Sequence, residues 1–201
     1  MAPRDRRAGV VVIAGLSGSG KTTAARHIVE SLEQKDCNAV YIDWAGSELS
    51  RLAARYMRSY PVRHTLFYIH LWAALQRLLE RLTYAVDLVI VEKWGFDIPF
   101  WNDPLAFDIV KDYEIIEPDV IIVLRGGRLE SDEGVTPAMC SLLTLDECFD
   151  RYMRLVERWA RRSMTMPKVK TVEPDPRRVY DELMVTGGVL GLPCLKKHWT
   201  L

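Results

Sequence analysis

The sequence predicts an α/β protein in which five parallel strands form one sheet with helices on both faces. One observation is the alternation of short apolar runs with segments whose apolar residues recur at three- and four-residue steps. Another is a glycine-rich stretch between the first apolar run and the first helical segment. The expected strands are residues 10–14, 39–42, 88–91, 120–124 and 168–172.

Helical periodicity and capping residues place helices between these strands. Glycines and a proline in residues 126–143, without any periodicity, predict a long mobile loop that could act as a lid. No linker or repeat divides the chain, so we expect a single domain over residues 1–201 with its core at about 9–186 and an unassigned tail at 187–201. The expected helices are residues 21–34, 47–58, 64–85, 103–113, 145–164 and 177–185.

The glycine-rich stretch has the spacing of a phosphate-binding loop, G-x-x-x-x-G-K-[ST], formed by Gly15, Gly20, Lys21 and Thr22. Glycines let successive backbone N–H groups converge on an anion, and the following helix adds its positive dipole end. We therefore expect a P-loop NTPase fold in which Lys21 contacts ATP phosphates and Thr22 ligates Mg²⁺. The alternative is a chance glycine turn. The expected ATP-binding residues are Gly15, Leu16, Ser17, Gly18, Ser19, Gly20, Lys21, Thr22 and Thr23.

Charged residues follow the second and third expected strands, where ligands of parallel sheets bind. Glu92 is expected to hold Mg²⁺ or orient the acceptor, and Lys93 to bind a phosphate, so that Lys21, Glu92 and Lys93 form the catalytic set. Asp43 is expected on the acceptor side. The alternatives are a solvated ion pair for Glu92 and Lys93 and a turn residue for Asp43.

Aromatic residues are frequent near these strand ends and early in the segment 64–85. Phe67, His70 and Trp94 are the candidates for binding the acceptor base, although core packing is the usual role of such side chains. No group of His and Cys residues has metal-ligand spacing, which predicts that no zinc is bound.

Arginines flank the expected loop 126–143. Arg125, Arg128 and Arg151 are candidates for clamping the charge that spreads over a transferred phosphoryl group. A solvated helix face is the alternative for the arginines that follow residue 150.

The composition excludes several classes of partner. Lys+Arg 27 balances Asp+Glu 27, so nothing in the overall charge indicates nucleic acid or a membrane surface. No apolar run is long enough to span a membrane, and the basic residues 4–7 are not followed by a secretory signal. The four cysteines form no C-x-x-C pair, and we expect reduced thiols in a cytoplasmic protein.

Together these segments resemble the nucleoside monophosphate kinases, and thymidylate kinases most closely, over roughly residues 10–185. Residues 15–26 are similar to the family's G-x-x-G-x-G-K-T-T-x-A-R opening. The resemblance implies that Phe67, in Thr65-Leu66-Phe67, stacks on the acceptor base. Glu92-Lys93-Trp94 takes the place of the family's Asp-Arg-Tyr. Further segments that resemble the family are 117–124, 145–158 and 174–176, the last implied to lie near adenine.

The sequence departs from this family in three places. Leu71 stands where the family has an arginine that holds the acceptor phosphate, residues 44–47 replace its E-P-G-G-T segment, and Glu92-Lys93 replaces its Asp-Arg pair. Residues 15–22 also resemble adenylylsulfate kinases, and Glu92-Lys93-Trp94 partly resembles the E-R-S segment of deoxynucleoside kinases.

The resemblance implies ATP- and Mg²⁺-dependent phosphoryl transfer to a nucleoside monophosphate, with thymidine monophosphate (dTMP) as the first candidate. The alternatives are a deoxynucleoside kinase or another small-molecule kinase, and a nucleotide-binding regulatory protein without catalytic activity. The expected partners are nucleotide substrates, with neither nucleic acid nor a membrane, and a homodimer is left open.

Overall fold

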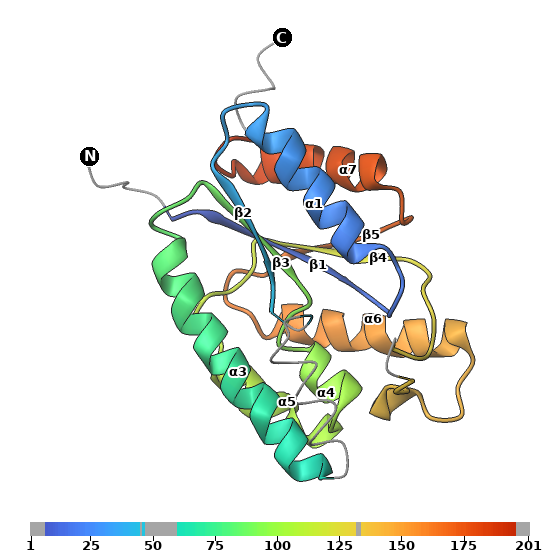
Figure 1. Ribbon diagram of the computed structural model, residues 1–201. Helices are drawn as coiled ribbons and strands as arrows, with labels where there is room; N and C mark the ends of the chain where they lie inside the picture. Colours follow the sequence, from blue (N-terminus) through green and yellow to red (C-terminus); the bar gives the residue numbers. More distant parts are fainter. Residues whose placement is uncertain (1–6, 45, 47–59, 132–133, 196–201) are drawn as a thin grey trace.

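A parallel sheet of five strands, in the order β2-β3-β1-β4-β5, forms the centre of the molecule (Figure 1). The computed structural model describes residues 7–44, 46, 60–131 and 134–195. The five predicted strands are confirmed to within one residue at each end. They are β1 (Gly9–Gly15), β2 (Ala39–Asp43), β3 (Leu88–Glu92), β4 (Val120–Leu124) and β5 (Lys168–Val172).

Helices cover both faces of this sheet, which is the three-layer arrangement that the sequence predicts. Helices α1 and α7 lie on one face, and α3, α4, α5 and α6 lie on the other (Figure 1). The helices are α1 (Lys21–Glu33), α3 (Pro61–Leu82), α4 (Asp97–Trp101), α5 (Phe107–Asp112), α6 (Leu145–Arg161) and α7 (Pro176–Leu190), with short 3-10 helices η1 (Pro104–Ala106) and η2 (Ala138–Cys140).

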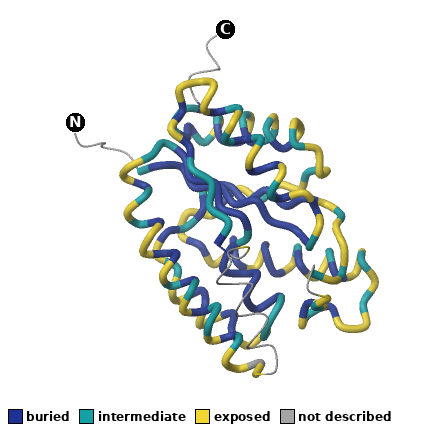
Figure 2. The backbone as a smooth tube through the Cα atoms, viewed as in Figure 1, coloured by how far each residue is buried: buried dark blue, intermediate teal, exposed yellow. Residues whose placement is uncertain are grey.

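The three central strands β1, β3 and β4 are buried along their whole length (Figure 2), whereas the edge strand β5 is partly exposed. Alternating side chains of the central strands contribute to two separate cores. On β1, Val10 and Val12 face the core under α3 and α6, whereas Val11 and Ile13 face the core under α1 and α7. All four are fully buried. This two-sided burial explains why the sequences of the central strands are continuous apolar runs, whereas β5 contains two lysines.

The helix ends follow local capping rules. Thr144 and Glu147 form a reciprocal capping box at the start of α6. At α7, the Asp175 side chain accepts a hydrogen bond from the Arg177 N–H, and Gly191 ends the helix in a left-handed conformation. Helix α7 therefore includes part of the segment that the sequence left unassigned.

Two features of the helices differ from the expectations, and one expected helix is not tested. Helix α4 was not predicted, because it has only five residues, which include Pro99 and two aromatic residues and show no helical periodicity. The segment 103–113 is divided into η1 and α5, and the predicted helix 47–58 lies outside the described residues. Within the part of the chain that the structure describes, no helix is long and apolar enough to cross a membrane.

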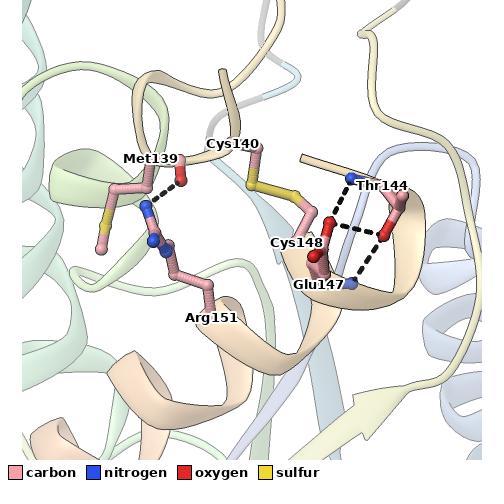
Figure 3. The surroundings of a disulfide bond; sticks show 6 residues. All are labelled: Met139, Cys140, Thr144, Glu147, Cys148 and Arg151. Atoms are coloured by element: carbon pink, nitrogen blue, oxygen red, sulfur yellow. Dashed lines mark hydrogen bonds between the residues drawn. A yellow bond between two sulfur atoms is a disulfide. The ribbon is translucent and has the colours of Figure 1, made fainter. Parts of the chain in front are cut away.

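The expectation of reduced thiols is wrong, because the four cysteines form two disulfides. Cys37, directly before β2, is bonded to Cys194 beyond α7, with a Cα–Cα distance of 5.6 Å. Cys140 in η2 is bonded to Cys148 in the first turn of α6 (Figure 3). Near this second bond, the Arg151 guanidinium donates to the Met139 carbonyl oxygen at 2.9 Å.

Candidate functional site

A cavity of about 540 Å³ lies beyond the carboxyl ends of β1, β2 and β3. The phosphate-binding loop and the residues that follow β2 and β3 form one part of it, and α3 and α4 form the other. Its position is that expected for ligands of a parallel sheet. The lining residues are Ser17, Gly18, Gly20, Lys21, Thr22, Thr23, Asp43, Trp44, Gly46, His64, Tyr68, Glu92, Lys93, Asp97, Ile98, Trp101, Asn102, Ser131 and Val135.

The loop between β1 and α1 has the backbone of an anion-binding site. Gly15, Gly18 and Gly20 have φ values of 141°, 68° and 84°, which side chains with a Cβ rarely adopt. Gly20 is the N-cap of α1, so the free N–H groups of the first helical turn face the cavity. Of the predicted ATP-binding residues, Leu16 and Ser19 are buried behind this surface, and Gly15 supports it from the end of β1.

Lys21 is buried, and its ammonium donates to the Leu16 carbonyl oxygen at 2.6 Å. Burial, and secondarily the nearby charge of Lys93, lower the pKa of Lys21 to about 8, against the opposing effect of Glu92. A buried ammonium costs free energy unless a negative charge lies beside it, and a bound polyphosphate supplies that charge. The side chain is thus placed to bind phosphate.

One carboxylate oxygen of Glu92 accepts hydrogen bonds from two hydroxyl groups. Its Oε2 accepts from the Thr22 hydroxyl at 2.8 Å and from the Tyr41 hydroxyl at 2.5 Å. Burial, followed by the hydrogen bond to Glu92, raises the pKa of the Tyr41 phenol. The oxygen donors of Thr22 and Glu92, with Asp43 on the neighbouring strand, fit a hydrated Mg²⁺, which prefers hard oxygen ligands.

Lys93 and Asp43 lie at the ends of adjacent strands, and both line the cavity. Lys93 has a φ of 63°, and its N–H donates to the Ile13 carbonyl oxygen at 3.1 Å. Asp43 accepts from the Gly46 N–H at 2.7 Å, so it also stabilises the turn after β2. The structure therefore brings together the predicted residues Lys21, Thr22, Glu92, Lys93 and Asp43.

The part of the cavity formed by α3 and α4 does not contain the other predicted acceptor residues. Phe67 and His70 do not line it, and His70 is exposed. Trp94 is fully buried in the core, where its indole N–H donates to Glu114 at 2.6 Å. The side chains found there instead are Trp44, His64, Tyr68, Ile98, Trp101 and Asn102.

His64 and Tyr68 are four residues apart on α3, so they share one face of the helix. Burial lowers the pKa of His64, against an opposing hydrogen bond with Asn102. The Trp44 ring lies 6.5 Å from that of Tyr68 and 5.8 Å from that of Trp72. This half of the cavity is thus aromatic, with polar atoms from His64 and Asn102.

The three predicted arginines occupy different surroundings. The Arg128 N–H donates to the Ser17 carbonyl oxygen at 2.8 Å, and the Arg128 side chain lies over Gly18. The Arg125 Nε lies 3.9 Å from Glu173 Oε1. The Arg151 guanidinium donates a hydrogen bond to the Met139 carbonyl oxygen. The segment 126–143 reaches the cavity through Ser131 and Val135.

Sequence reasoning missed two buried polar residues beside the loop. Asp97 in α4 lines the cavity, and its Oδ2 accepts from the Trp94 N–H at 2.7 Å. Its Oδ1 accepts from the Tyr152 hydroxyl at 3.0 Å, and that hydroxyl accepts from the Gly15 N–H at 3.2 Å. Burial raises the pKa values of both side chains. The sequence signal for Asp97 was a carboxylate within an aromatic and apolar stretch, whereas Tyr152 lies among the charged residues of an amphipathic helix and gave no signal.

Comparisons with known proteins agree with this architecture. A family model described as an AAA domain matches residues 4–93, which include the phosphate-binding loop. No curated protein matches the sequence.

Two thymidylate kinases are similar in structure. That of Candida albicans has a TM-score of 0.57 at 13% identity, and the match covers 92% of this chain and 93% of the other. That of Ehrlichia chaffeensis has a TM-score of 0.59 at 15% identity, covering 93% of this chain and 100% of the other. At these identities the likeness establishes the fold alone: the chain has a P-loop fold like that of thymidylate kinases.

Proposed function

We propose that this protein is a kinase that transfers the γ-phosphoryl group of ATP to a nucleoside monophosphate. The observation that carries the proposal is the meeting of Lys21, Thr22 and Glu92 in one cavity that continues into an aromatic chamber between α3 and α4. A phosphate site alone would suit any nucleotide-binding protein. The adjoining chamber adds space for a second, planar substrate.

The residues have distinct roles in this proposal. The loop N–H groups and Lys21 bind the phosphates and stabilise charge as it moves onto the bridging oxygen. Thr22 and Glu92 hold Mg²⁺, which neutralises part of the phosphate charge when bound. Lys93 faces the same space from β3 and attracts the phosphate of the acceptor.

We propose dTMP as the first acceptor to test. Support comes from the fold shared with two thymidylate kinases and from the aromatic chamber. Leu71 remains the feature against it, because no arginine stands at that position to hold the acceptor phosphate. In this proposal Lys93, directly after β3, supplies the missing positive charge.

Two alternatives follow from specific residues. If Glu92 acts as a base on a sugar hydroxyl, the acceptor is a deoxynucleoside. If Leu71 marks a lost acceptor site, the protein binds nucleotides without transferring phosphate.

An acceptor panel distinguishes these cases. Purified protein is incubated with Mg²⁺, γ-labelled ATP and, one at a time, the common nucleosides and nucleoside monophosphates. We expect label in a nucleoside diphosphate, with the highest yield from dTMP. Label in a monophosphate formed from a nucleoside indicates the second kind of kinase. ATP binding without transfer to any acceptor would overturn the assignment as a kinase of either kind.

A further inference from the structure

A chain of hydrogen bonds joins the start of the phosphate-binding loop to α6 and α4. The Gly15 N–H donates to the Tyr152 hydroxyl, which donates to Asp97 Oδ1, and Asp97 Oδ2 accepts from the Trp94 N–H. The three bonds are 3.2, 3.0 and 2.7 Å long. Tyr152 is fully buried and Asp97 is 4% exposed. Neither side chain belongs to the loop that it supports.

The topology of the sheet explains why Gly15 needs a partner from outside the sheet. Ile13 pairs with Glu92, the last residue of β3, and the Ile13 carbonyl accepts from the Lys93 N–H. Gly15 lies two residues further along β1, so its N–H points toward the same side. There β3 has ended, and its chain has turned away at Lys93, whose φ is 63°. The Tyr152 hydroxyl therefore accepts the hydrogen bond that a carbonyl oxygen of a longer β3 would accept.

Asp97 orients the Tyr152 hydroxyl. A buried hydroxyl that accepts a hydrogen bond from an N–H also needs an acceptor for its own O–H. The Asp97 carboxylate is that acceptor for Tyr152. The second oxygen of Asp97 is fixed by the Trp94 N–H, which orients the carboxylate. The bond from Gly15 is therefore part of a network in which both side chains are held in place.

We propose that Tyr152 and Asp97 are positioning residues that hold the first turn of the phosphate-binding loop in the shape that receives the triphosphate of ATP. This inference relies on the proposed function only for ATP as the ligand of the loop. Without the network, the Gly15 N–H is buried and unpaired, and the loop relaxes to find another acceptor. The loop amides then point less well at the phosphates, so ATP affinity falls.

The test substitutes Tyr152→Phe, which removes one oxygen atom and keeps the ring. Calorimetric titration with Mg²⁺ and ATP is expected to show a Kd about tenfold higher than that of the parent. Hydrogen exchange at the Gly15 amide is expected to become faster in the free protein. Asp97→Asn keeps the shape of the side chain but places an NH₂ group or a weaker acceptor in the network, and we expect the same direction of change.

Two control variants separate positioning from general destabilisation. The Tyr180 hydroxyl is buried without a hydrogen-bond partner among the described residues, so Tyr180→Phe removes the same atom without breaking a bond. The Thr186 hydroxyl donates to Glu182 within α7, so Thr186→Val loses a side-chain hydrogen bond away from the loop. Both controls should bind ATP as the parent does, even where Thr186→Val lowers the melting temperature.

Unchanged ATP affinity in Tyr152→Phe would overturn the inference, whatever its melting temperature. So would an equal loss of affinity in Thr186→Val, because the effect would then follow stability. If Asp97→Asn binds ATP as the parent does while Tyr152→Phe binds it more weakly, the positioning role of Asp97 would be excluded. These readouts are independent of phosphoryl transfer, so they remain valid if the protein binds ATP but proves not to be a kinase.

Discussion

The two disulfides should contribute unequally to stability, because they close loops of very different length. Cys37 and Cys194 are 157 residues apart, whereas Cys140 and Cys148 are 8 apart. The chain-entropy relation predicts that the long loop stabilises the fold by about 5 kcal/mol and the short one by about 2.5 kcal/mol. The perturbation is the paired substitution of each bond, Cys37→Ala with Cys194→Ala, and Cys140→Ala with Cys148→Ala.

Chemical denaturation of the two double variants and the parent, each under oxidising conditions, measures the difference. We expect the variant without the Cys37–Cys194 bond to have the lower midpoint. Dithiothreitol should lower the midpoint of the parent and of each variant that retains a bond, but a variant lacking all four cysteines should not respond. If loss of the 140–148 bond lowers the midpoint more than loss of the 37–194 bond, loop length does not govern the contributions of the two disulfides to stability.

Three further predictions concern the cavity. Glu92→Gln should lower kcat by about a hundredfold with little change in the Kd for ATP, because the lost charge acts mainly in the transition state. Steady-state kinetics measures kcat and calorimetry measures the Kd. A normal kcat would exclude a role of Glu92 in phosphoryl transfer. Lys21 has a pKa of about 8 in the free protein and must be charged to bind phosphate, so ATP affinity should fall as pH rises above about 8. Calorimetry near pH 8 in buffers of different ionisation enthalpy should detect proton uptake on binding, absent in Lys21→Met; no buffer dependence in the parent would contradict it. Residues 126–143 should gain protection from hydrogen exchange when ATP and acceptor analogues bind together, and unchanged protection would exclude a lid.

The phosphate-binding half of the cavity could be predicted because its residues are fixed by local rules. The spacing of Gly15, Gly20 and Lys21 carries the loop geometry, and the carboxyl end of a buried strand places Glu92 beside it. The central strands were predictable for a related reason, since burial on both faces produces uninterrupted apolar runs.

The part of the cavity between α3 and α4 could not be predicted, because it depends on which face of a helix or turn each side chain occupies. Lys93, directly after β3, has a left-handed conformation, and the side chain of Trp94 lies in the core instead of the cavity. On α3, His64 and Tyr68 face the cavity, whereas Phe67, which the resemblance singled out, does not line it. A difference of one residue on a helix rotates a side chain by about 100°.

Long-range pairings were the remaining omission. Nothing near Cys37 indicates that Cys194 will lie beside it, because their approach depends on how α7 packs against α1. The hydrogen bond from Tyr152 to Asp97 likewise joins residues from separate elements of the chain. Such contacts arise from the assembled fold, and a single sequence does not display them.

The most direct test of the central claim is transfer of label from γ-labelled ATP to dTMP, followed side by side for the parent and Lys21→Ala. We expect label in thymidine diphosphate with the parent. With Lys21→Ala we expect a rate lower by about a hundred- to a thousandfold, because one charged group is removed from the phosphate site. Lys21→Ala must remain folded, as shown by its circular dichroism and melting curve. Equal rates for the two proteins would show that phosphoryl transfer does not occur at the phosphate-binding loop, and the proposed function would be wrong.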